Sequence, residues 1–97
     1  MKTLHLIILI LLFSGCTVNP KYVTDCVSLC TAAKNAGLDF SNGPCLSNDY
    51  YPDYVCDVAH NPRISIDNLV ENQCSAFGVN ASHFVEVDAS CSVISVV

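Results

Sequence analysis

The chain has 97 residues, seven cysteines and a formal charge of −5 at neutral pH, which is enough for one small domain. Behind residue 15, three basic residues remain against nine acidic ones. Because the sequence contains no basic patch, nucleic acid is excluded as a partner, and so is adsorption to anionic lipid through charge.

Residues 1–15 have the form of a secretory signal. Lys2 supplies the positive end, and residues 6–13 are an unbroken apolar run. A helix of about eight to ten residues reaches only about 12–15 Å, whereas the hydrocarbon core of a bilayer is about 30 Å thick. The run is therefore too short to span a membrane and is predicted to be the apolar region of a signal peptide.

The residues before Cys16 distinguish two processing routes. An ordinary signal peptidase prefers small residues at the last and third-last positions of the signal, and Phe13 occupies the latter. The stretch Leu-Phe-Ser-Gly-Cys instead resembles the lipobox of prokaryotic lipoproteins, which usually has Leu where Phe13 stands. The resemblance implies a diacylglyceryl lipid with palmitate on Cys16, and a location at the cell membrane or cell surface, outside the cytoplasm. The alternative is an ordinary secreted protein with a chance cysteine.

Three parts are expected: the signal peptide 1–15, a lipidated N-terminus with a short tether 16–24, and a cysteine-rich extracytoplasmic domain 25–97.

Small domains often need covalent bridges, because a core of this size rarely supplies more than ~3–5 kcal/mol of stability. Six cysteines behind an export signal, with no C-x-x-C pair, indicate disulfides rather than zinc. The pairing is left open among Cys26, Cys30, Cys45, Cys56, Cys74 and Cys91.

The first element expected in the domain is a helix over residues 25–36. Asp25 can cap its start, and Gly37 lies where a left-handed residue commonly ends a helix. Cys26 and Cys30 fall on its apolar stripe. We therefore predict that both cysteines bridge to other elements rather than to each other.

The remaining residues are expected to alternate between loops, strands and one more helix. Residues 38–49 hold an Asn-Gly-Pro turn and are expected to form a loop. The tyrosines at 50–54 are interpreted as a cover for the core, with an aromatic binding patch as the alternative. Periodicity and capping residues predict a strand at 54–60, a helix at 68–77 and strands at 82–88 and 91–97. The expected fold is α+β, with two helices on a short antiparallel sheet in the order α-β-α-β-β.

Two short motifs each pair an imidazole with a carboxylate three residues away: Asp57 with His60, and His83 with Glu86. On a helix such a pair would share one face and could bind a metal, but on a strand the two side chains point to opposite faces. Because both segments are expected to be strands, no catalytic residue is firmly assigned, and no metal or other cofactor is predicted. A mixed site that joins His60 to His83 or Glu86 is the remaining alternative for zinc or general-base chemistry.

Two further polar features have simpler interpretations. Arg63 lies close in the sequence to Asp67 and Glu71, and we expect turn and cap chemistry there, with an ion pair to either acid. Asn80 begins the tripeptide Asn-Ala-Ser, which fits the N-glycosylation sequon. The sequon matters only in a host that glycosylates asparagine outside the membrane.

Four stretches carry a second resemblance: NGPCLSN at 42–48, VCDVAHNPR at 55–63, DN with ENQC within 67–74, and HFVEV at 83–87. They are similar to short cysteine-rich lipoproteins of archaeal genomes. The resemblance implies a location and a domain boundary, and it brings no catalytic residues. The leading hypothesis is a lipid-anchored domain that binds a protein or small-ligand partner at the cell surface. The alternatives are a structural envelope component and a small metal-binding protein or hydrolase that uses Asp57, His60, His83 and Glu86.

Overall fold

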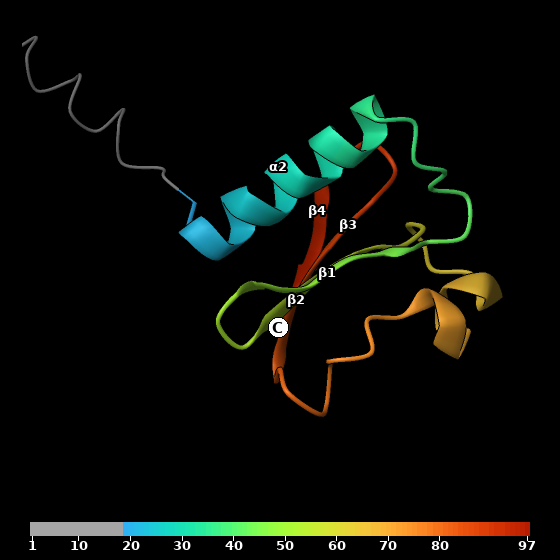
Figure 1. The fold of residues 1–97 in the computed structure, drawn as a ribbon. Coiled ribbons are helices and arrows are strands. Elements are labelled where there is room, and N and C mark those ends of the chain that lie inside the picture. The colour runs from blue at the N-terminus through green and yellow to red at the C-terminus, as the bar shows by residue number, and fades with distance from the viewer. Residues whose placement is uncertain (1–18) are drawn as a thin grey trace, which may run out of the picture.

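The computed structural model (Figure 1) describes residues 19–97, so the expected signal peptide and Cys16 lie outside the described residues. One long helix covers one face of a four-stranded sheet, and a connection with two short 3₁₀ helices covers the other. The α+β class is confirmed, whereas the expected two helices and strand order are wrong. The elements are α2 (Lys21–Asn35), β1 (Cys45–Tyr51), β2 (Tyr54–Val58), η1 (Ser65–Asn68), η2 (Val70–Asn72), β3 (His83–Val87) and β4 (Val93–Val96).

Helix α2 begins at Lys21, so residues 21–24 of the expected tether are helical. Pro20 precedes it, and the carbonyl oxygen of Pro20 accepts hydrogen bonds from two N–H groups of the first turn at 3.0 and 3.1 Å. Because proline has a fixed φ near the helical value, it suits the start of a helix. Gly37 follows the helix with a φ of +87°, as expected for a left-handed C-terminal residue.

The sheet has the order β1-β2-β3-β4 and is mixed rather than antiparallel. β2 and β3 run parallel in a continuous register from Tyr54↔His83 to Val58↔Val87, and the two outer pairs are antiparallel. Parallel neighbours need a crossover between them, and residues 59–82 provide it. This crossover lies on the face of the sheet away from α2 (Figure 1).

Alternation along β2 and β3 divides the apolar side chains between two small cores. The larger core lies under α2, and the smaller one lies under the crossover. Strand residues with odd and even positions face opposite sides because the side-chain period of a strand is two. The larger core includes Val23, Cys26, Cys30, Cys56, Val58, Val85 and Val87, and the smaller one includes Val55, Cys74, Ala81 and Phe84.

The helix predicted over 68–77 is wrong, since η1 and η2 take its place. Val70 would belong to the apolar face of the predicted helix, but it is 82% exposed. A segment of about ten residues is marginal as an isolated helix unless an apolar face is packed. The carboxylate of Asp67 instead accepts the backbone N–H of Ile64 at 2.9 Å, which stabilises the tighter 3₁₀ turn.

Strand β1 was also missed, because a loop was expected over most of it. Its interior is the polar sequence Ser-Asn-Asp, which lacks the alternation of a half-buried strand. β1 is an edge strand, and its pairing with β2 is interrupted by two register shifts. An edge strand with one solvated side tolerates such a polar composition. The extended conformation of β1 therefore depends more on its hydrogen bonds to β2 than on the hydrophobic pattern of its own sequence.

The six cysteines of the domain form three disulfides, which confirms that disulfides cross-link the domain. Two of them, Cys26–Cys56 and Cys30–Cys91, tie α2 to β2 and to the turn before β4. The third, Cys45–Cys74, ties β1 to the crossover on the opposite face. Within residues 19–97, no helix is both long enough and apolar enough to cross a membrane.

Candidate functional site

A pocket of about 390 Å³ lies between the sheet and the crossover, on the face away from α2. Val55 and Phe84 from the two central strands form its apolar floor, and Phe77 from the crossover forms one wall. The rings of Phe77 and Phe84 meet edge to face, with centroids 5.3 Å apart. Asp57 and Glu86 introduce two carboxyl groups into this apolar setting.

The two acids meet because β2 and β3 are parallel neighbours in which Asp57 pairs with Glu86. Glu86 is buried at 7% exposure and forms an ion pair with the Nη1 group of Arg63. Asp57 is half-buried, and within residues 19–97 no hydrogen-bond donor reaches its buried Oδ1 atom. Burial, followed by the negative charge of Glu86, raises the pKa of Asp57 to about 7. The pocket therefore holds a carboxyl group that can change its protonation state near neutral pH.

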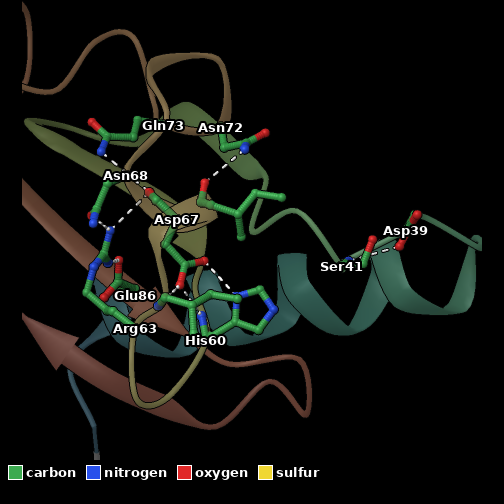
Figure 2. A network of polar contacts seen from close by, with 11 residues as sticks. Asp39, Ser41, His60, Arg63, Asp67, Asn68, Asn72, Gln73 and Glu86 are labelled. Atoms are coloured by element: carbon green, nitrogen blue, oxygen red, sulfur yellow. Dashed lines mark hydrogen bonds and ion pairs between the residues drawn. The ribbon is translucent and has the colours of Figure 1, made fainter.

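Arg63 is held in place by the crossover itself (Figure 2). Its Nη2 group donates to the backbone oxygen of Asp67 at 3.1 Å and to the side-chain oxygen of Asn68 at 3.0 Å. Its Nη1 group donates to Glu86, and both residues line the pocket. These contacts occupy both terminal nitrogens of the guanidinium, so Arg63 binds Glu86 and the crossover rather than Asp57.

Asp67 is the centre of the polar network shown in Figure 2. It is only 3% exposed, and its carboxylate accepts the backbone N–H groups of His60 and Ile64 at 3.1 and 2.9 Å. Its Oδ1 atom also lies 2.8 Å from Nδ1 of His60. Burial acts to raise the pKa of Asp67, but the hydrogen bonds from Ile64 and His60 outweigh it and hold that pKa below its ordinary value. Asp67 therefore organises the crossover that carries Arg63.

Gly43 packs directly against this network. A side-chain Cβ at Gly43 would lie 2.5 Å from Oδ1 of Asp67 and 2.9 Å from the backbone oxygen of Val58. The φ of Gly43 is +64°, which favours glycine. The Asn-Gly-Pro turn expected from the sequence thus has a second role, because it closes over the buried carboxylate.

The structure brings together two of the four predicted site residues. Asp57 and Glu86 share the pocket, whereas His60 contacts Asp67 and His83 stacks on the ring of Tyr54 with centroids 4.9 Å apart. His83 pairs with the first residue of β2, and His60 lies beyond its last residue, more than about 13 Å further along the strand direction. Among residues 19–97, no group of three or more His, Cys, Asp or Glu side chains is arranged to hold a metal ion.

The structure also places the Asn80 sequon and the ion pair of Arg63. Asn80 lies in an exposed loop of the crossover, so the sequon is accessible. The expected ion pair of Arg63 with Asp67 or Glu71 is replaced by the pair with Glu86, and Arg63 meets only the backbone oxygen of Asp67.

Sequence reasoning missed the Asp57–Glu86 pair and the role of Arg63. In a strand over residues 54–60, Val55 and Asp57 lie on the same face, and this alternation was the only local signal. Their meeting with Phe84 and Glu86 depends on the register of two parallel strands joined by a long crossover, and no local pattern reports such a register.

Comparison with known proteins gives no further assignment: no family model, no curated protein and no solved structure matches the chain.

Proposed function

We propose that the protein is a lipid-anchored extracytoplasmic domain that binds a small organic amine in the pocket above Asp57. The ligand has an apolar body and a cationic, hydrogen-bond-donating head. The observation that carries this proposal is the carboxyl group of Asp57, which lines a pocket of about 390 Å³ and whose buried Oδ1 atom lacks a donor within residues 19–97. Pockets of roughly 300 Å³ and above accept small ligands.

The chemistry of the pocket favours a cation over an anion. Arg63 is occupied by Glu86 and by the crossover, so it has little left to offer an anionic ligand. An ammonium group, by contrast, can pair with the carboxyl group of Asp57, which lines the pocket, and can replace the proton that this carboxyl holds near pH 7. The aromatic pair Phe77 and Phe84 provides the apolar wall for the rest of the ligand.

The location is supported by two independent features. The residues that end at Cys16 resemble a lipobox, and the three disulfides within residues 19–97 are typical of proteins outside the reducing cytosol. A diacylglyceryl group satisfies the need for two acyl chains in stable membrane attachment. Intact-mass analysis of membrane-extracted protein tests this part, because it reports cleavage, lipid and disulfides together.

Calorimetric titration of the mature protein tests the pocket. The probes are 2-phenylethylamine and the neutral 2-phenylethanol, which differ only in the head group. We expect the amine to bind, the alcohol to bind far more weakly, and Asp57→Asn to lose the preference for the amine. Asp49→Asn is the matched control, because Asp49 is exposed on β1 and lies outside the pocket.

The pH dependence gives a second criterion. An ammonium ligand pairs with the ionised form of Asp57, so its affinity is expected to rise as the pH rises through about 7. Equal binding of amine and alcohol, or an unchanged amine preference in Asp57→Asn, would overturn the proposal.

A further inference from the structure

All four tyrosines of the chain gather in one cluster at the end of the domain where α2 begins. Tyr22, in the first turn of α2, stacks on Tyr54 with ring centroids 4.4 Å apart and meets Tyr51 edge to face at 5.7 Å. The hydroxyl of Tyr50 donates to the backbone oxygen of Tyr22 at 2.6 Å. Figure 1 shows the turn between β1 and β2 at the same end as the start of α2. We call Tyr22, Tyr50, Tyr51 and Tyr54 the tyrosine cluster.

The cluster does not present a flat ring to a planar ligand. Tyr54 lies between Tyr22 and His83, stacked on both, with centroids 4.4 and 4.9 Å away. Both faces of its ring are therefore covered, which argues against a platform for a sugar or a base. Each tyrosine is nevertheless partly exposed, so every member of the cluster contributes to the surface of the domain. The tyrosine side chain has an apolar ring and a polar hydroxyl, and tyrosine is enriched at the interface between membranes and water.

The covalent chain keeps the cluster close to any lipid on Cys16. Four residues lie between Cys16 and Lys21, where α2 begins, so five Cα–Cα steps join the two. At a maximum of about 3.6 Å per residue, this segment reaches no more than about 18 Å. The start of α2, which carries Tyr22, is thus held within about 18 Å of the attachment point.

The charges around the cluster select the type of lipid. Lys21 is paired with Asp25 at 2.9 Å on the surface of α2. Asp49 and Asp53 are exposed on the strand and turn that carry the other tyrosines. Because these acids would be repelled by anionic head groups, a zwitterionic lipid surface fits the cluster better than an anionic one.

We propose that the tyrosine cluster rests in the interfacial region of a zwitterionic bilayer and fixes the orientation of the domain on the membrane. This inference rests on the lipid anchor of the proposed function. In this orientation the first turn of α2 and the turn between β1 and β2 face the lipid. The tyrosine cluster thereby restricts the orientation of a domain that the lipid alone would leave free to rotate on its tether.

The composition of the chain makes a direct test available. The protein has four tyrosines and no tryptophan, so its intrinsic ultraviolet emission comes from the cluster alone. The lipidated protein is reconstituted in phosphatidylcholine vesicles whose acyl chains carry bromine close to the head group, and in unbrominated vesicles. Bromine quenches only nearby fluorophores, and we expect a large loss of tyrosine emission in the brominated vesicles.

Flotation and intact mass, measured on the same samples, separate the two hypotheses. Protein that floats with the vesicles and keeps its full emission overturns the docking contact while the anchor stands. Protein that carries no lipid and does not float overturns the anchor and the docking contact together. Cys16→Ser, which removes the lipid, is the matched control and is expected to show no quenching. Adding phosphatidylglycerol to the vesicles should reduce the quenching of the lipidated protein, and quenching that increases instead would contradict the choice of a zwitterionic surface.

Discussion

Asp57 and Glu86 occupy paired positions on the parallel strands β2 and β3, so their carboxyl groups project from the same face into the same pocket. Only Glu86 forms an ion pair with Arg63. Among the described residues 19–97, no donor reaches the buried oxygen of Asp57. Two acids that are neighbours in space therefore have different roles, since one is neutralised by the protein and the other is available to a ligand.

Asp57 should make stability depend on pH. Its pKa rises from an ordinary 3.8 to about 7 in the folded protein, so between these values the folded protein holds a proton that the unfolded chain has released. The free energy of unfolding should therefore fall as the pH rises from about 4 to about 7, by roughly 2–4 kcal/mol. Urea unfolding at several pH values measures this change.

Asp57→Asn should remove most of that decline, because an amide does not titrate. Asp67 has a lowered pKa, so its contribution is present above the ordinary carboxyl pKa and is lost only as the pH falls below it. The two effects thus lie in different pH ranges. A variant that lacks Asp57 but keeps the same decline between pH 4 and 7 would show that another group is responsible.

Removing Arg63 should leave Glu86 buried without a counterion. Breaking a fully buried pair costs about 3–5 kcal/mol, and because the Arg63 side chain is 40% exposed, we expect Arg63→Met to lower the free energy of unfolding by about 2–3 kcal/mol. Lys21→Met is the matched control. Its ion pair with Asp25 is largely exposed and should contribute less than about 1 kcal/mol.

The charge itself can be tested with a second substitution. Adding Glu86→Gln to Arg63→Met removes the unpaired charge and should recover a large part of the lost stability, as measured by urea unfolding. If the double variant is less stable than Arg63→Met alone, the main contribution of Arg63 lies in its contacts with Asp67 and Asn68 instead.

The parts of the fold that were predicted correctly are those with a local signal. The stripe that carries Cys26 and Cys30 predicted α2, and the alternation around Val85 predicted β3. The left-handed residue at the end of α2 was also predicted correctly, because this feature depends only on the φ of Gly37. Each of these features depends on residues within a few positions of one another.

The parts that could not be predicted depend on distant residues. β1 is polar inside and is defined by its partner β2. The segment 68–77 had helix-like capping residues, but its apolar Val70 is exposed rather than packed in the core. The pocket requires Asp57 and Glu86 to meet through a parallel register. The alternative of a mixed site that joins His60 to His83 also depended on distant residues, and the parallel register places these two histidines near opposite ends of the strands.

Gly43 should be more sensitive to substitution than Gly37. Both have a positive φ, so Ala costs about 1–2 kcal/mol at each position from backbone strain. At Gly37 no atom of the described part of the chain lies within 4 Å of the added Cβ, whereas at Gly43 the added Cβ would lie 2.5 Å from Oδ1 of Asp67. We expect Gly43→Ala to be less stable than Gly37→Ala by about 1–3 kcal/mol in urea unfolding. Equal losses would show that the Asp67 network gives way without cost.

The disulfides should have separable roles on the two faces of the sheet. Cys45–Cys74 holds the crossover against β1, and Cys74 lines the pocket. Cys30–Cys91 lies on the opposite face, where it ties α2 to the turn before β4. Replacing either pair by alanine should cost roughly 2–5 kcal/mol, so the loss of stability alone does not distinguish them.

The pKa of Asp57 does distinguish them. Without Cys45–Cys74 the crossover can move away from the sheet and water can reach Asp57, so burial no longer raises its pKa to about 7. We expect carbon-detected NMR titration to show this pKa falling towards 3.8 in the Cys45→Ala/Cys74→Ala variant. It should stay near 7 in Cys30→Ala/Cys91→Ala, whose bridge lies across the sheet from the pocket. Circular dichroism shows first that α2 is retained in both, and a similar fall of the pKa in both variants would mean that the pocket depends on the whole domain rather than on the crossover.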